Sequence, residues 1–151
     1  MSMNDDIALL SIVPLFAELG EDKLRLIAFG AEHRRVSAGQ ELFREGTPAD
    51  CGFAVGFGRF SLSSASRDGQ PVVHEMAGRG SLLSELALIS AVPRKFTATA
   101  DEDSDVIRIN RPLFRRMLEE YPEVATIVET RLRDNLSALA RRAGAMQGRF
   151  A

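Results

Sequence analysis

Two oppositely charged residues stand out in the middle of this 151-residue chain. Glu85 and Arg94 lie in the segment 80–100, whose other residues are mostly apolar or small and whose pattern is too irregular for one continuous helix or strand. Two explanations suit such a pair: a structural ion pair, or a small polar ligand that both side chains hold.

The ligand explanation accounts for more of the segment. A buried ion pair stabilises a fold weakly, because the desolvation of both charges offsets most of their attraction. By contrast, backbone N–H groups at the start of a short helix and one arginine can together bind an anion, and a carboxylate can accept hydrogen bonds from hydroxyl groups. A ligand with a singly charged phosphate and a neighbouring sugar hydroxyl would therefore satisfy both residues.

The overall composition limits the classes of protein to consider. With 45% hydrophobic residues, 26% charged residues and a formal net charge of −2, the chain is typical of one soluble globular domain. A sequence pI near 5.7 argues against direct DNA binding, which normally needs an excess of Lys and Arg. The apolar runs are far shorter than the roughly 20 residues of a membrane span, so we expect a cytoplasmic protein with no membrane association.

Enzyme classes find little support in the sequence. A metal-binding β-roll enzyme would need several converging ligands, and the only histidines are His33 and His74. No Ser or Cys has a recognisable base motif beside it, and the single cysteine, Cys51, cannot form an internal disulfide. We therefore expect no catalytic residue, no metal and no cofactor.

Helical patterns occupy the two ends of the chain. Residues 5–29 carry apolar residues at spacings of three and four, interrupted by Pro14, which predicts two short helices. Pro112 and Pro122 each start a C-terminal helix, and the last helix, to about residue 142, has an apolar stripe. Such a stripe must be covered by the β-roll, by the same helix of a second copy, or by both along its length, so a homodimer through this helix is one expectation.

Between these helices the pattern is that of β-structure. Short segments of period two alternate with glycine-bearing turns, and Asp68-Gly69 is a strong hairpin signal. About eight strands predict an α+β, mainly β class: an antiparallel double-sheet jelly-roll β-barrel flanked by N-terminal helices and two C-terminal helices. The expected single domain comprises N-terminal helices over 1–33, a β-roll over 34–110, C-terminal helices over 111–142 and a tail over 143–151. Within the segment 80–100, Ser84 is expected to cap a short helical turn.

The segment 80–100 closely resembles the phosphate-binding cassette of the cyclic nucleotide-binding domain family, which includes the catabolite activator protein and the regulatory subunits of protein kinase A. The family's cassette reads approximately Gly-Glu-Leu-Ala-Leu, a short spacer and Pro-Arg-x-Ala-Thr. This chain has Ser-Glu-Leu-Ala-Leu at 84–88, a four-residue spacer and Pro-Arg-Lys-Phe-Thr at 93–97. The glycine turn at 45–50, the strand and glycine at 55–58 and the hairpin at 68–69 resemble family features in the same order, so the resemblance covers about residues 10 to 139.

This resemblance implies roles for the residues of the cassette. Glu85 would accept a hydrogen bond from the ribose 2′-hydroxyl, and Arg94 would pair with the cyclic phosphate. The backbone N–H groups of Leu86, Ala87 and Lys95 would complete the phosphate cradle.

Two positions depart from the family's pattern. Ser84 stands where the family usually has glycine, so its side chain could crowd the sugar or oppose a positive φ. Phe96 replaces a small alanine, and its ring either narrows the ligand site or joins the core of the roll. The alternation of Phe96, Ala98 and Ala100 on one face of a strand favours the core.

The leading hypothesis is a stand-alone cyclic nucleotide sensor, for cAMP rather than cGMP, that signals through the C-terminal helix to an unidentified effector protein. In the family the last helix closes over the base, and the expected lid positions here are Arg131, Leu132 and Asn135. The alternative is a β-roll that no longer binds nucleotide and serves as a protein-interaction or dimerisation module. Both readings stay open on the sequence alone.

Overall fold

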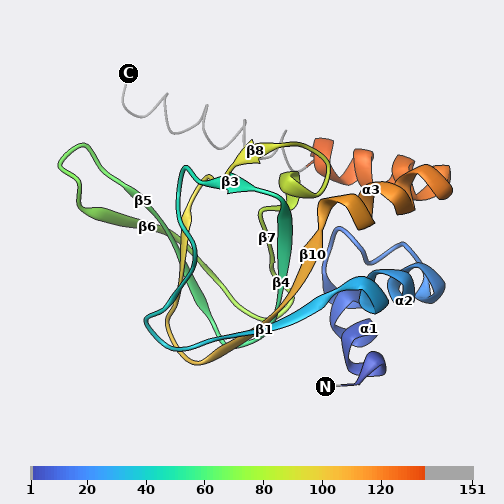
Figure 1. The fold of residues 1–151 in the computed structure, drawn as a ribbon, viewed down its shortest axis with the longest axis horizontal. Helices are drawn as coiled ribbons and strands as arrows, with labels where there is room; N and C mark the ends of the chain where they lie inside the picture. Colours follow the sequence, from blue (N-terminus) through green and yellow to red (C-terminus); the bar gives the residue numbers. More distant parts are fainter. Residues whose placement is uncertain (1, 135–151) are drawn as a thin grey trace.

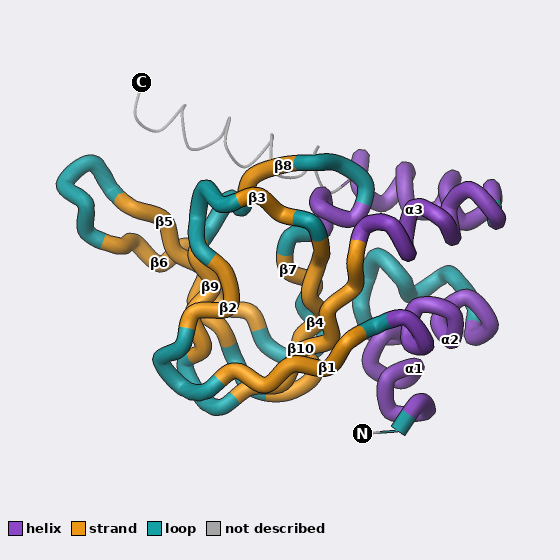
Figure 2. Tube along the Cα trace, viewed as in Figure 1, coloured by secondary structure: helices purple, strands orange, loops and turns teal. Residues whose placement is uncertain are grey.

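Helices and strands occupy separate sides of the molecule. The structure, a computed structural model, describes residues 2–134 (Figures 1 and 2). The strands form two four-stranded antiparallel sheets and one two-stranded sheet, and the helices gather beside one face of the first four-stranded sheet. The α+β, mainly β class is confirmed, as an open roll of two sheets and not a closed barrel.

The N-terminal helices are α1 (Met3–Ile12) and α2 (Glu21–Gly30). The Ser2 side chain accepts a hydrogen bond from the Asp5 N–H, and the Asp5 carboxylate accepts one from the Ser2 N–H, so the pair forms a capping box at the start of α1. Gly20, with a φ of 85°, precedes α2. The prediction of two short helices in this part of the chain is confirmed.

The first sheet lies next to the helices and has the strand order β1-β10-β4-β7. Its strands are β1 (Glu32–Val36), β10 (Ser104–Asn110), β4 (Cys51–Phe57) and β7 (Leu82–Leu83). Strand β1 is an edge of this sheet, and it begins at Glu32, within the range expected for the N-terminal helices.

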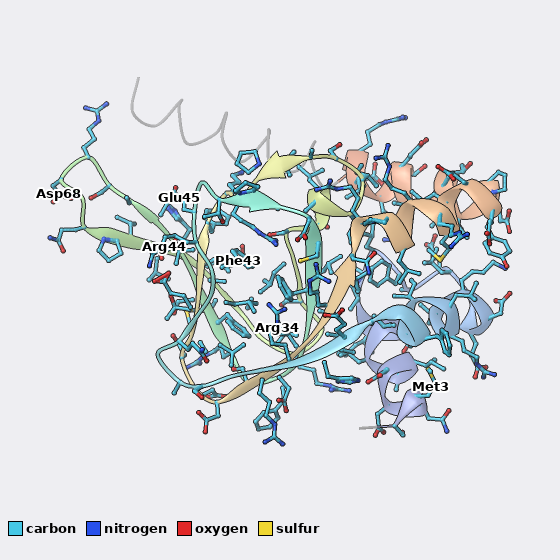
Figure 3. All side chains as sticks on the ribbon, viewed as in Figure 1. Met3, Arg34, Phe43, Arg44, Glu45 and Asp68 are labelled. Carbon is cyan, nitrogen blue, oxygen red and sulfur yellow. The ribbon has the colours of Figure 1, made fainter. Side chains whose placement is uncertain are left out.

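The second sheet has the order β2-β9-β5-β6, and its strands are β2 (Glu41–Phe43), β9 (Thr97–Ala100), β5 (Phe60–Ala65) and β6 (Pro71–Ala77). A small sheet pairs β3 (Pro48–Ala49) with β8 (Val92–Pro93). The β5–β6 hairpin projects from the roll with Asp68 at its tip (Figure 3). The predicted turn is confirmed, and its positive φ falls on Gly69.

The two faces of the first sheet belong to different cores. On the face toward the helices, Ala54, Ile107 and Ile109 are buried together with residues of α1, α2 and α3. On the face toward the second sheet, Phe53, Val55 and Val106 are buried together with residues of β5 and β9. The alternation of side chains along β4 and β10 produces this division.

The C-terminal part is helical as predicted. Helix α3 (Arg111–Glu120) starts after Asn110, whose side chain accepts a hydrogen bond from the Leu113 N–H, and Pro112 lies in its first turn. Residues 122–134 form a second helical segment. Its apolar residues Val124, Val128 and Leu132 are buried in the core on the helical side, so this part of the predicted stripe is covered by the chain itself.

Candidate functional site

The segment 80–100 folds back across the end of the roll. It contains β7, a short 3₁₀ helix, η1 (Glu85–Leu88), and then β8 and β9. Ser84, immediately before η1, has φ 62° and ψ 47°, and it is the only non-glycine residue with a positive φ among the described residues. The predicted side-chain cap is wrong, because the Ser84 hydroxyl makes no capping hydrogen bond in this left-handed conformation.

The backbone of Arg94 is fixed by the turn that precedes β3. Its N–H donates to the carbonyl of Thr47 and its carbonyl accepts from the N–H of Gly46, both at 2.8 Å. The turn at residues 46 and 47, which the sequence marks with a glycine and the following Pro48, therefore sets the direction from which the arginine side chain enters the roll.

The guanidinium of Arg94 lies inside the roll, and its residue is only 6% exposed. Its Nη1 donates to the carbonyl of Cys51 at 2.9 Å, and its Nη2 lies 3.2 Å from the Cys51 Sγ. The guanidinium carbon is 4.5 Å from the ring centre of Phe43 and 5.4 Å from that of Phe53, and these two rings stack on each other. A carbonyl, a thiol and two aromatic faces thus surround one positive charge.

Among residues 2–134, this positive charge makes no direct ion pair, although the Asp50 carboxylate is near enough to interact with it electrostatically. Within residues 2–134, no carboxylate forms an ion pair with Arg94. A charged hydrogen bond contributes about 1.5–3 kcal/mol and a cation–π contact about 0.5–2 kcal/mol. These contributions are of the same order as the desolvation penalty of several kcal/mol, and an anion beside Arg94 would add a charged hydrogen bond to them.

Glu85 is the first residue of η1 and is half-buried. Leu86 and Ala87 follow it in η1, and the Ala87 N–H donates to the Ser84 carbonyl at 3.0 Å, within the turn. Lys95, beside the buried arginine, is exposed, and its Nζ lies 5.7 Å from the ring centre of Phe96. The predicted cradle residues thus belong to one continuous segment around Arg94.

Phe96 lies one residue before β9. It is half-buried and packs against the apolar cluster inside the roll, and its ring centre is 5.4 Å from that of His74 on β6. Ala98 and Ala100, two and four positions further on, are both buried in the same cluster. The aromatic side chain therefore lies at the border between the core of the roll and solvent.

Asp50 is the carboxylate next to the cysteine that holds Arg94. Its side chain pairs with Arg108 on β10 at 3.1 Å. Partial burial alone would raise the pKa of Asp50, but the adjacent Cys51 thiol and the positive charges of Arg108 and Arg94 outweigh it and hold this pKa below its ordinary value. Asp50 therefore stays ionised at neutral pH.

Arg111 ties the cassette to the C-terminal helices. It is the first residue of α3, and its Nε donates to the carbonyl of Ala87 in η1 at 2.8 Å. Its Nη2 donates to the carbonyl of Ala49 in β3, and its N–H donates to the carbonyl of Asp50 at 2.9 Å. One residue thus connects η1, β3 and the start of α3.

The expected lid residues lie on the helical side of the molecule. Arg131 pairs with Glu18, in the connection between α1 and α2, and Leu132 is buried among the N-terminal helices. Asn135 lies outside the described residues.

Several residues that shape the site were not predicted from sequence. Cys51 looked like an ordinary buried side chain, yet it binds Arg94 through both its carbonyl and its thiol. Its position on β4, two residues before Phe53 and on the same face, was the available signal. Phe43, Phe53 and Arg111 could be found only from the pairing of strands that are distant in sequence.

Two hollows lie elsewhere on the described part of the molecule. An apolar hollow of about 20 Å³ lies between α2, α3 and β10, away from the cassette. A polar hollow of about 230 Å³ lies at the edge strand β1 and is lined by His33, Arg34, Arg35 and Asp105. In the described part of the chain, none of the helices has the length and apolar character needed to cross a membrane.

Known proteins share the sequence and fold of this chain. The family model for the cyclic nucleotide-binding domain matches residues 33–121, more than half of the chain. A cyclic nucleotide-binding-like protein from Brucella abortus is 44% identical, with a TM-score of 0.68 over 76% of this chain and 98% of that chain. The regulatory domain of Toxoplasma gondii PKA, co-crystallised with cAMP, is 27% identical, with a TM-score of 0.71 over 76% of this chain and 44% of that chain.

A relative among curated proteins is much longer than this chain. The lysophospholipase nte1 of Neurospora crassa is 29% identical over 131 residues. These residues make up 84% of this chain but only 9% of the relative. The chain thus spans about a tenth of the length of that enzyme.

Proposed function

The chain belongs to the cyclic nucleotide-binding domain family, and we propose that it is a regulatory domain that binds cAMP inside the β-roll. In this proposal Arg94 pairs with the cyclic phosphate, and Glu85 accepts a hydrogen bond from the ribose 2′-hydroxyl. The protein performs no chemistry on the ligand, and the bound nucleotide acts as a signal. The proposed setting is the cytoplasm, without direct binding to DNA, in keeping with the net charge of −2.

One observation carries this proposal. Arg94 is buried inside the roll without a direct ion pair among residues 2–134, and it is held by a neutral carbonyl, a thiol and two aromatic rings. A positive charge in such a place is costly unless an anion can reach it. A singly charged cyclic phosphate matches one guanidinium, and hydrogen bonds between charged partners are the strong ones.

The proposed preference for cAMP over cGMP is supported by two observations. The Toxoplasma relative was crystallised with cAMP, and the half-buried ring of Phe96, beside the exposed ring of His74, offers aromatic surface at the border of the roll. Such surface favours stacking of a purine of either kind. Titration with both nucleotides is therefore part of the test.

Signalling would run through Arg111. Because this residue bonds to the carbonyl of Ala87 in η1 and starts α3, a ligand-induced shift of η1 changes the position of α3. Helix α3 and residues 122–134 would then present a different surface to an effector protein or to a second copy of the chain. A two-state movement biased by ligand contacts is the physical basis of such a switch.

Isothermal titration calorimetry with cAMP and cGMP tests the binding proposal. The substitution Arg94→Ala should weaken binding roughly tenfold to a hundredfold, the effect of losing one charged hydrogen bond. The matched control is Arg44→Ala, which removes an exposed arginine on the neighbouring turn and should leave the affinity unchanged. Absence of binding to either nucleotide at millimolar concentration would overturn the proposal and favour an interaction module.

Hydrogen exchange tests the signalling proposal separately. With saturating cAMP, amide protection should change in η1, in α3 and in residues 122–134. The substitution Arg111→Ala should preserve the change in η1 and reduce that in α3. Identical exchange of α3 with and without cAMP would contradict the coupling while leaving the binding proposal intact.

A further inference from the structure

A second arginine enters the interior of the roll from the edge strand β1. Arg34 pairs in register with Val106 of β10, which in turn faces Val55 of β4. Both valines are buried in the cluster between the two sheets. Paired residues of neighbouring strands share one face, so Arg34 is on the inner face of the first sheet. Figure 3 shows Arg34 and Phe43 pointing into the space between the sheets.

The two arginines contact the same aromatic ring. The guanidinium carbon of Arg34 lies 5.7 Å from the ring centre of Phe53, and that of Arg94 lies 5.4 Å from it. Both positive charges are therefore within 5.7 Å of the centre of a single phenylalanine ring. The two guanidinium groups therefore have one ring as a common neighbour, and a nucleotide with two phosphate groups could contact both.

Among residues 2–134, the carboxylates near Arg34 form their ion pairs with other arginines. Glu32 pairs with Arg108, and Asp105 pairs with Arg35. Of the carboxylates that the structure describes, none forms an ion pair with Arg34 itself. Arg108, the other inward arginine of this sheet, is already engaged by two carboxylates, Glu32 and Asp50.

The space beside Arg34 is open. Arg34 is exposed although it lies on the inner face, because β1 is the edge strand of its sheet. A phosphate could approach its guanidinium without displacing a buried group. Arginine suits this contact because its planar donors match the oxygens of a phosphate.

We propose that Arg34 is a second phosphate-binding residue, and that the site therefore binds nucleotides with two phosphate groups more tightly than it binds cAMP. The inference rests on the proposed function, because it takes Arg94 as the first phosphate contact. The shared ligand chemistry is a purine nucleotide with one phosphate at Arg94 and another at Arg34. A cyclic dinucleotide and a linear nucleoside bisphosphate both have it.

Calorimetric titration of the full chain with three adenine probes tests this proposal. The probes are cAMP, cyclic di-AMP and adenosine 3′,5′-bisphosphate, which share the base and differ in the number and linkage of phosphates. At least one probe with two phosphates should bind about tenfold more tightly than cAMP, and its affinity should fall more steeply with salt. The probe that does so identifies the source of the second phosphate.

The matched variants are Arg34→Ala and Arg35→Ala. They remove the same charge from adjacent positions, but the Arg35 side chain is 94% exposed on the other face of β1. Arg34→Ala should remove the tenfold advantage of the two-phosphate probe and change the affinity for cAMP by less than about threefold. Arg35→Ala should leave every affinity unchanged, and thermal unfolding should show that both variants are folded.

Two results would overturn the proposal for Arg34 without affecting the proposed function. The first is that cAMP binds at least as tightly as both other probes. The second is that Arg35→Ala weakens binding of the two-phosphate probe as much as Arg34→Ala does. If cAMP binds and responds to Arg94→Ala in either case, the proposed function stands. If none of the three probes binds, the proposed function itself fails, and this inference fails with it.

Discussion

The two faces of the sheet β1-β10-β4-β7 carry different chemistry. Toward the helices the sheet buries Ala54, Ile107 and Ile109 against apolar side chains such as Phe16 and Phe114. Toward the second sheet it buries Phe53 and Val106, but the same space also admits the guanidinium groups of Arg94 and Arg34. Both faces are made by the same strands, so the difference lies only in alternate residues.

The comparison separates residues that stabilise the fold from residues that serve the ligand. An apolar core stabilises by removing surface from water, and each atom lost from it costs free energy of unfolding. A buried arginine without a direct ion pair lowers the free energy of unfolding, because its desolvation opposes folding. Substitutions on the helical face should therefore change stability, and those on the inner face should change binding.

The largest effect is expected for Phe114→Ala on the helical face. Phe114 is 1% exposed and packs against Phe16, so the cavity should lower the free energy of unfolding by about 3–5 kcal/mol. Chemical denaturation measures this change. The control Phe57→Ala removes a ring that is 62% exposed and should alter stability by less than about 0.5 kcal/mol. Equal losses in the two variants would show that the helical face is not the stabilising core.

The next effect is expected for Arg94→Met on the inner face. The loss of the charged contact should weaken cAMP binding by about 1.5–3 kcal/mol, which calorimetry measures. The free energy of unfolding should stay within about 1 kcal/mol of the wild type or increase, because an apolar side chain of similar length replaces a costly buried charge. A loss of more than about 3 kcal/mol in stability would mean that Arg94 is a structural residue, and the contrast between the faces would not hold.

A smaller effect is expected for Ser84→Gly. The left-handed conformation costs a non-glycine residue about 1 kcal/mol, and glycine adopts it freely but loses more entropy on folding. The variant should gain up to about 0.5 kcal/mol in thermal unfolding. Ser63→Gly, in the extended strand β5, should lose about 0.5–1 kcal/mol by comparison. If the two serine variants shift stability in the same direction, strain at Ser84 is excluded.

The smallest effect concerns Asp50, the exposed carboxylate between the inner face and the cassette. Since its pKa in the folded protein is lowered, its ionised form stabilises the fold above the ordinary pKa of 3.8, and this contribution disappears as the pH falls through the lower folded value. Asp50→Asn should therefore be less stable than the wild type at pH 6, by less than about 1 kcal/mol given its exposure. The two unfolding curves should converge below pH 3.8, and a difference that grows on acidification would contradict the assigned cause.

The sequence was sufficient for the architecture because local signals agree along the chain. Pro112, Pro122 and Asp68-Gly69 each mark a boundary that the structure has at that place. The family resemblance of residues 84–97 pointed to the fold, and the family match confirms it. The prediction from residue type was wrong at Ser84. Its backbone adopts a left-handed conformation that is unfavourable for serine but is imposed by the surrounding segment.

The surroundings of the candidate site could not be predicted in the same way. Cys51, Phe43 and Arg34 lie on three strands that are separated in sequence, and their meeting depends on strand order and register. A one-residue change of register would turn Arg34 from the inner face to the outer face. The identities of Glu85 and Arg94 were readable from sequence, whereas the environment that makes Arg94 useful comes from long-range pairing.

Cys51 gives this protein a built-in chemical reporter. It is the only cysteine in the chain, it is 1% exposed, and its sulfur lies 3.2 Å from the Arg94 Nη2. A thiol reagent can therefore react only when the roll opens locally around the arginine, and the rate of modification measures how often that occurs. A nucleotide bound at Arg94 should slow this reaction in proportion to its occupancy. Ligand libraries can accordingly be screened on the unmodified chain by following the labelling of one atom.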